Sequence, residues 1–151
     1  MKVEILIIKV SKCYPLRHKM LRKGKPLETC HFDGDNSKGT FHLGALVDKE
    51  IIGIISIYDK ELSQFKISKG AQFRGIAVAS KYQRKGVASK LINYAQKETI
   101  KRINPKYIWL NGRISANNLY LDRGFKPIGN PFEINTIGIH QRFIKMIFYD
   151  N

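Results

Sequence analysis

The residues best suited to chemistry form one short run near the middle of the chain, made of Gln83, Arg84, Lys85, Gly86, Val87 and Ala88. An apolar strand is expected before this run, over 71–79, and an amphipathic helix after it. The first N–H groups of a helix find no acceptor within the helix, so such an end attracts anions. Gly86 has no side chain to keep a phosphate away, and Arg84 and Lys85 can add charge-assisted contacts. The run therefore predicts an anion-binding loop.

Hydrophobic periodicity and turn residues place this run within a series of strands and helices. The expected elements are a strand over 2–10, a short basic helix after Pro15, a long irregular loop over 23–40, a hairpin over 41–47 and 51–58, a strand over 71–79, helices over 83–102 and 114–123, and strands over 107–110, 125–128 and 141–149. The first strand is rich in Val and Ile, so much of both of its faces is expected to be covered. The order predicts one α/β (α+β) domain over 1–151, with a mixed sheet and helices on both faces.

Composition narrows the class of protein. The 151 residues suffice for one domain with a full core, and no apolar run approaches the ~20 residues that cross a bilayer. The first residues carry charges and lack a signal-peptide cleavage site, so a cytoplasmic location is expected. Cys13 and Cys30 have neither metal nor disulfide spacing and are expected to be inert thiols. The formal charge of +15 suits any polyanion, including nucleic acid, an acidic protein or a phosphorylated cofactor.

No metal site is expected. The stretch over 33–37 resembles a calcium loop, but loop position six holds Lys38 where glycine is required, and position twelve holds Gly44 where glutamate is required. Cys30 and His31 are neighbours in the sequence, which does not establish the geometry of a nucleophile and its base.

Two motifs, in order, are similar to those of the GNAT-type N-acetyltransferases. Residues 83–88 fit the pyrophosphate-binding signature Q/R-x-x-G-x-G/A, although a helix with one glycine in its first turn is also common without a ligand. Residues 113–125 fit N/Q-x-x-A-x-x-L/F-Y-x-x-x-G-F, with Arg113 in place of the usual Asn or Gln and Asn117 one helical turn away. In register with this second motif are Ala116, Leu119, Tyr120, Gly124 and Phe125. The segment with Glu133 and His140 is similar to a small subset of uncharacterised bacterial members.

This resemblance implies the acyl-CoA N-acyltransferase fold, a three-layer domain with six or seven mostly antiparallel strands. It places acetyl-CoA, as a cosubstrate, in a splay between the strands at 73–79 and 107–111, with the diphosphate on the loop over 83–88. The pantetheine arm would bond like an added strand to the backbone of Ile76, Ala77 and Val78. A backbone N–H near Ala77 or Val78 would polarise the thioester carbonyl. Tyr120, and either Arg113 or Asn117, would also contact the cofactor.

The resemblance also implies direct attack of a primary amine on the thioester, in a ternary complex. Tyr120 stands where many members have a general acid, and its phenol could protonate the departing thiolate; simple aromatic packing is the alternative. An amine with a pKa near 10.4 is neutral in only roughly one molecule in a thousand at pH 7, so some base is needed. Glu133 and His140 are the candidates, with a water chain as the alternative and two loop carboxylates, Glu28 and Glu61, as weaker options.

The acceptor is expected to be an amine of a small molecule or a peptide, bound by residues 16–40 and the C-terminal segment, as the resemblance implies. Basic side chains there would favour an acceptor with a carboxylate or phosphate near its amine, unless they form a solvated face; they are Arg17, Lys19, Arg22, Lys23 and Lys25. The alternative function is a catalytically weak CoA sensor or a basic nucleic-acid-binding module, although no recognition-helix pattern supports the latter. No membrane partner is expected, and a homodimer is left open.

Overall fold

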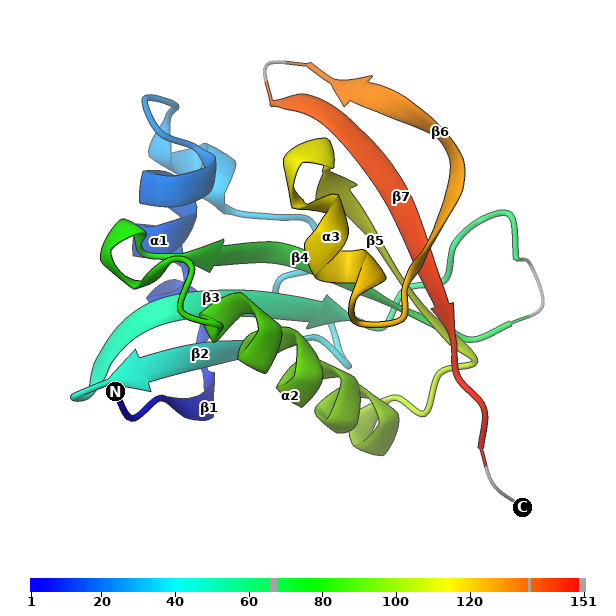
Figure 1. The fold of residues 1–151 in the computed structure, drawn as a ribbon, viewed down its shortest axis with the longest axis horizontal. Coiled ribbons are helices and arrows are strands. Elements are labelled where there is room, and N and C mark those ends of the chain that lie inside the picture. Colours follow the sequence, from blue (N-terminus) through cyan, green and yellow to red (C-terminus); the bar gives the residue numbers. More distant parts are fainter. Residues whose placement is uncertain (66–67, 136, 150–151) are drawn as a thin grey trace.

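The computed structural model describes residues 1–65, 68–135 and 137–149. Within these residues, seven strands form one sheet in the order β1-β2-β3-β4-β5-β7-β6 (Figure 1). Neighbouring strands are antiparallel except β4 and β5, which are parallel. The strands are β1 (Glu4–Ile8), β2 (Phe41–Val47), β3 (Glu50–Tyr58), β4 (Gly70–Val78), β5 (Tyr107–Arg113), β6 (Lys126–Ile134) and β7 (Gly138–Met146). The mixed, mostly antiparallel sheet that was expected is confirmed.

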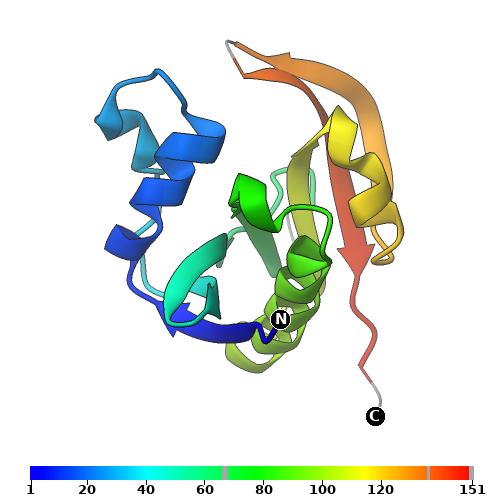
Figure 2. The same ribbon diagram turned by 60° about the vertical axis from the view of Figure 1, so that its left-hand side comes forward.

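Helices lie on both faces of this sheet, as expected (Figures 1 and 2). On one face, α1 (Tyr14–Leu16) continues directly into a π-helical stretch, η2 (Arg17–Leu21), and on the other face lie α2 (Val87–Arg102) and α3 (Asn117–Leu121). Short 3-10 turns are η1 (Val10–Lys12), η3 (Leu27–Cys30), η4 (Ser80–Tyr82) and η5 (Ile114–Ala116). None of the helices in the described ranges is long and apolar enough to cross a membrane.

α2 packs on the sheet through residues at helical spacing. Leu91, Ile92 and Ala95 are fully buried and share one core cluster with Ile55 and Ile57 of β3. Full burial of each large aliphatic side chain stabilises the fold by about 1.5–3 kcal/mol. This packing fixes where α2 begins, and with it the position of the loop that joins β4 to α2.

α1 packs on the opposite face in a smaller cluster that joins Leu16 to Ile54 and Ala77. Cys13 belongs to the same cluster, and both Cys13 and Cys30 are buried and free of disulfides. Burial raises the pKa of the Cys13 thiol to about 11. A protonated, enclosed thiol is a poor nucleophile, which agrees with the prediction of inert cysteines.

The two parallel strands diverge soon after they meet. β4 and β5 pair only over 70–73 and 107–110. Past that point the register of β4 against β3 shifts, and Gly75 has φ +66°, a left-handed conformation that favours glycine. The edge of β4 over 74–78 that faces β5 has no strand partner in the described chain. The expected splay is therefore present.

β1 is less covered than expected. It is an edge strand, paired only with β2 among the described strands, and its Leu6 and Ile7 side chains are exposed. The prediction of cover on both faces was wrong, because a run of apolar β-formers does not reveal whether another element packs over each face.

Several element boundaries also differ from expectation. α2 begins at Val87 and not at residue 83, because residues 83–86 form a turn with φ +60° at Arg84 and φ +80° at Gly86. β6 runs to Ile134, beyond the strand predicted over 125–128, and β7 begins at Gly138 and ends at Met146, three residues before the predicted bounds at both ends. Residues 129–131, beyond the predicted end, lie inside β6, where its register against β7 shifts.

Candidate active site

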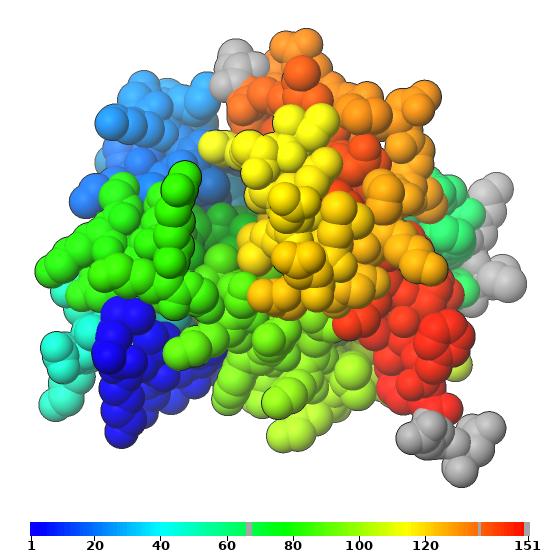
Figure 3. All heavy atoms as spheres, viewed as in Figure 1, coloured from blue at the N-terminus to red at the C-terminus, as the bar shows by residue number. Residues whose placement is uncertain are grey.

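A cavity of about 740 Å³ lies where β4 and β5 diverge. In Figure 3 the surface is hollowed between the loop that follows β4, in green, and α3, in yellow. Of the residues predicted for the site, those that line the cavity are Ile76, Ala77, Val78, Gln83, Arg84, Ala88, Arg113, Tyr120 and His140. Those that do not line it are Lys85, Gly86, Val87, Asn117 and Glu133.

The loop before α2 has the properties of an anion site. Gln83 Nε2 donates to the carbonyl oxygen of Val78 at 3.0 Å, which ties the loop to the end of β4. The first backbone N–H of α2 that donates a helical hydrogen bond is that of Lys90, whose acceptor is the Gly86 carbonyl at 3.1 Å. Within the described residues, the N–H groups over 84–89 have no backbone acceptor. A Cβ at Gly86 would meet nothing within 4 Å, so a ligand can approach these N–H groups closely.

The strand before this loop contributes backbone rather than side-chain chemistry. Ile76, Ala77 and Val78 line the cavity along the open edge of β4. An extended ligand arm can bond to such an edge as an added strand. Val87, by contrast, turns its side chain into the core, so it can offer the site only its backbone N–H.

Tyr120 lines the cavity from α3. Its side chain is 4% exposed and packs against Phe125 and Phe143, with the ring directly over Gly112, where a Cβ would overlap it. Burial raises the pKa of the phenol to about 12, although the charge of Arg113 lowers it. The hydroxyl therefore stays protonated at neutral pH and can act only as a hydrogen-bond or proton donor toward an anion.

His140 lines the cavity from β7 and is 6% exposed. Its Nδ1 lies 2.8 Å from the carbonyl oxygen of Gly138. Because a carbonyl only accepts, Nδ1 must carry the proton of the neutral ring, and Nε2 keeps the lone pair. A base needs this tautomer. The contact with Gly138 uses Nδ1, so Nε2 remains able to accept a proton.

Glu133 lies apart from these groups. Phe132 pairs with His140 across the β6–β7 hairpin, so the next residue, Glu133, points to the opposite face and is exposed. The sequence placed Glu133 and His140 together as candidate bases, but the structure brings only His140 to the cavity. Glu28 and Glu61 do not line it either.

The geometry agrees with the results of comparison with known proteins. A family profile described as an acetyltransferase (GNAT) domain matches residues 27–147. The chain belongs to the GNAT acetyltransferase family. A relative named uncharacterized N-acetyltransferase YitI, from Bacillus subtilis (strain 168), is 30% identical over 138 residues, which cover 91% of this chain and 92% of that protein. This GNAT enzyme is therefore an acyltransferase that depends on acetyl-CoA.

Solved structures share its fold. A chain of the NatC complex bound to Gag peptide and CoA has a TM-score of 0.77 at 18% identity, over 98% of this chain and 100% of that one. Escherichia coli ElaA has a TM-score of 0.76 at 14% identity, over 95% and 99% of the two chains. An aminoglycoside 6'-N-acetyltransferase complexed with coenzyme A has a TM-score of 0.75 at 13% identity, over 98% and 99%. At these identities the likeness establishes the fold alone.

The second motif of the GNAT enzyme departs from the usual pattern at Arg113, and the structure separates its two polar residues. Arg113, at the end of β5, lines the cavity, whereas Asn117 does not. Asn117 Oδ1 is buried and has no hydrogen-bond partner among the described residues. Arg113 is thus the one of the two that a ligand in the cavity can contact.

The prediction of the site did not single out several further residues of the cavity, among them Gln72, Arg74 and Phe32, although Phe32 lies within the segment 16–40 that was expected to bind the acceptor. Gln72 and Arg74 lie on β4, and Phe32 follows η3. A signal was present for the first two, since a polar amide and a guanidinium interrupt an otherwise apolar strand. Phe32 gave no such signal, because it lies in a loop without periodicity.

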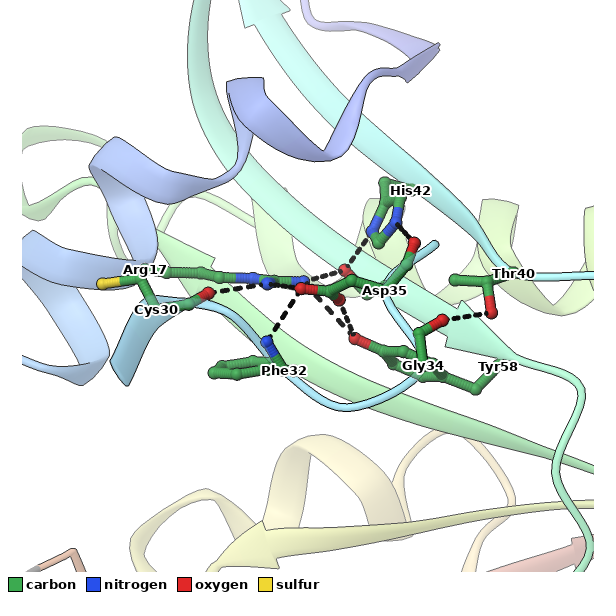
Figure 4. A network of polar contacts seen from close by, with 9 residues as sticks. Arg17, Cys30, Phe32, Gly34, Asp35, Thr40, His42 and Tyr58 are labelled. Carbon is green, nitrogen blue, oxygen red and sulfur yellow. Dashed lines mark hydrogen bonds and ion pairs between the residues drawn. The ribbon is translucent and has the colours of Figure 1, made fainter. Parts of the chain in front are cut away.

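Arg17, which was predicted to face the acceptor, is instead fully buried and does not line the cavity; Figure 4 shows its contacts. Its guanidinium donates to both carboxylate oxygens of Asp35, at 2.7 and 3.0 Å, and to the carbonyl of Cys30 at 2.8 Å. The guanidinium also lies 4.0 Å from the Phe32 ring centroid. The prediction for Arg17 was wrong because its charge is matched inside the protein by a carboxylate from the loop over 31–40.

Asp35 joins this loop to the sheet. It accepts hydrogen bonds from the Phe32 N–H at 2.8 Å and the Tyr58 hydroxyl at 2.7 Å, as well as from Arg17. Burial alone would raise the pKa of the carboxyl, but these hydrogen bonds outweigh it and hold the pKa below its usual value. The contacts fix Phe32 at the wall of the cavity.

Proposed function

We propose that this GNAT enzyme moves an acetyl group from acetyl-CoA to a primary amine by direct attack in a ternary complex. The observation that carries the proposal is that one cavity is lined both by backbone groups able to bind the cofactor and by side chains able to transfer protons. Backbone groups of β4 and of the anion loop form one part, and Tyr120 and His140 contribute groups able to move protons. No cysteine is among the described residues that line it, which favours direct attack over an acyl-thiol intermediate.

The residues present fit acetyl-CoA. The N–H groups over 84–89, which have no backbone acceptor among the described residues, would hold the diphosphate, and Arg84 would add a positive charge at the cavity wall. The open β4 edge over 76–78 would bond to the amides of the pantetheine arm. When bound, acetyl-CoA supplies a thioester whose acyl carbon is the electrophile.

His140 is the base in this proposal, and Tyr120 is the acid. Nε2 of His140 would take a proton from the amine, which is almost wholly protonated at neutral pH. The Tyr120 hydroxyl, kept protonated by burial, would donate toward the sulfur that leaves. Glu133 has no part, because it lies on the other face of the hairpin.

The proposal is tested by release of free thiol from acetyl-CoA in the presence of amines, amino acids, polyamines and peptides. We expect release that depends on an acceptor, with the acetylated amine identified by mass spectrometry. Uptake of CoA in calorimetry without turnover of any amine would instead support a CoA sensor, and no uptake of CoA at millimolar ligand would contradict the cofactor site.

Substitution of Tyr120→Phe keeps the packed ring and removes only the donor. We expect kcat to fall by about 100-fold, in the range of general acid catalysis, with the affinity for acetyl-CoA little changed. Tyr94→Phe, at an exposed position on α2, is the matched control and should behave as the unmodified enzyme. Equal kcat values in the two variants would remove Tyr120 from the mechanism.

Substitution of His140→Gln removes the basic nitrogen. We expect kcat/KM to fall by about 100-fold or more, and thermal unfolding should show whether the fold is kept. His31→Gln, at an exposed position, is the control. If the His140 variant keeps full activity, the amine must lose its proton by another route, such as a water chain.

A further inference from the structure

Among the described residues, no acid forms an ion pair with the arginines of the cavity. Of the described lining residues, four are arginines, namely Arg22, Arg74, Arg84 and Arg113, and none is an aspartate or glutamate. The ion pairs within the described residues, Arg17 with Asp35 and Arg102 with Glu98, involve none of these four arginines. The cavity therefore presents positive charge that no acid among its described lining residues balances.

Two of these arginines lie away from the loop that would hold the diphosphate. Arg74 is at the far end of the open β4 edge, four residues before Val78, which corresponds to about 13 Å along a strand. Arg22 follows η2, on the other face of the sheet from α2. A diphosphate on the N–H groups over 84–89 leaves the charges of Arg22 and Arg74 unmatched.

Arg22 and Arg74 converge on one aromatic ring. Their guanidinium carbons lie 5.1 and 4.7 Å from the centroid of Phe32. Burial, and then the charges of Arg74 and Arg113, lower the pKa of Arg22. An anion placed among the guanidiniums would relieve their repulsion and accept their N–H groups.

A buried amide next to Arg74 also lacks a partner. Gln72 is 5% exposed and lines the cavity, yet its Oε1 is enclosed without a hydrogen-bond donor in the described structure. Because it lies two residues before Arg74 on the same strand, its side chain is on the same face of the sheet. A buried acceptor without a donor is unfavourable, so a ligand with an N–H group fits there.

We propose that the acceptor is a small amine that also carries an oxyanion, a carboxylate or a phosphate, and that Arg22 and Arg74 bind the oxyanion while Gln72 accepts from an N–H of the same molecule. Arg113 adds a third positive charge at the end of β5. This inference rests on the proposed function, since it names the substrate class of the same cavity. The overall charge of the protein plays no part in it.

The test compares matched amines in the thiol-release assay. Butylamine is paired with 4-aminobutanoate, and ethanolamine with phosphoethanolamine, so that the second member of each pair differs by its anion. We expect kcat/KM to favour at least one anionic member by about 10-fold or more, as for a charge-assisted hydrogen bond. A preference within the first pair indicates that the site binds a carboxylate, and a preference within the second indicates that it binds a phosphate.

Variants of Arg22 and Arg74 test whether these residues cause the preference for the anionic amine. Arg74→Gln and Arg22→Gln should each raise KM for the anionic amine by about 10-fold, with kcat, the KM of the neutral amine and the affinity for acetyl-CoA nearly unchanged. Lys19→Gln is the matched control, because Lys19 is a basic residue of η2, three positions before Arg22, that is exposed and does not line the cavity. Equal kcat/KM for charged and neutral amines, or equal effects of Arg74→Gln and Lys19→Gln, would overturn the inference and leave the proposed function intact.

Calorimetry separates the inference from the proposed function. The same amines are titrated into the enzyme saturated with CoA, where no acetyl transfer occurs. Binding of the anionic amine that is lost in Arg74→Gln supports the oxyanion site even if no amine is acetylated, a result that would contradict only the proposed function. Binding that persists in Arg74→Gln would count against the oxyanion site whatever the enzyme acetylates.

Discussion

The Phe32 ring contacts arginines of two kinds. Arg17 is fully buried, and Asp35 matches its charge with two hydrogen bonds. Arg22 and Arg74 lie over the same ring but line the cavity, with no acid paired to them in the described residues. A carboxylate inside the protein thus makes one arginine structural, and its absence leaves the other two open to a ligand.

The largest expected effect comes from removing that carboxylate. Asp35→Asn keeps the shape of the side chain but leaves the Arg17 charge buried and unmatched, so the free energy of unfolding should fall by about 3–5 kcal/mol. Asp33→Asn, two residues away and exposed, should change it by no more than about 0.5 kcal/mol. Both are measured by urea unfolding. If the two variants unfold alike, Arg17 and Asp35 do not form the structural pair described above.

Removal of the Phe32 ring, which contacts both the buried Arg17 and the two cavity arginines, should have a smaller effect on stability. It should also change KM. Phe32→Leu loses the cation–π contacts, so the free energy of unfolding should fall by roughly 1–2 kcal/mol. KM for an anionic acceptor should rise as well, because Arg22 and Arg74 lose the surface that orients them. Phe148→Leu, at a position that is 90% exposed, is the control. A loss of stability with no change in KM would mean that the ring supports only the buried pair.

The smallest expected effect is a difference in acid sensitivity. The pKa of Asp35 is held below its usual value in the fold, since hydrogen bonds from Arg17, Tyr58 and the Phe32 N–H outweigh burial. Its contribution to stability is therefore complete above the unfolded pKa of about 3.9, and is lost as the pH falls through the lower folded pKa. Between pH 5 and pH 2, the unmodified enzyme should lose more unfolding free energy than Asp35→Asn. Parallel losses would show that the Asp35 pKa is not lowered by folding.

Much of the framework could be predicted from local patterns. The hairpin of β2 and β3, the body of α2 and the two motifs depend on periodicity and turn residues that act over a few positions, and they appear where expected. The sequence could not distinguish Arg17 from Arg22, because both lie in one basic stretch. It also could not separate Glu133 from His140, since the face to which each side chain points depends on the register of β6 against β7.

Asp35 is another residue whose role could not be predicted from the sequence. In the sequence it stands in a stretch that resembles an incomplete calcium loop, and nothing local indicates a partner. In the fold it joins Arg17 and Tyr58, which are 18 and 23 residues away along the chain. Such a contact is set by how the loop over 31–40 closes on the sheet, not by the spacing of residues within it.

The amino-acid sequence by itself determined the family and the place of the loop before α2, because these depend on short-range geometry and on residue types in fixed order. Only the tertiary structure decided which charged side chains are matched inside the protein and which are left to a ligand. The physical reason is that the state of a buried charge depends on what lies within a few ångströms of it, and those neighbours come from distant parts of the chain.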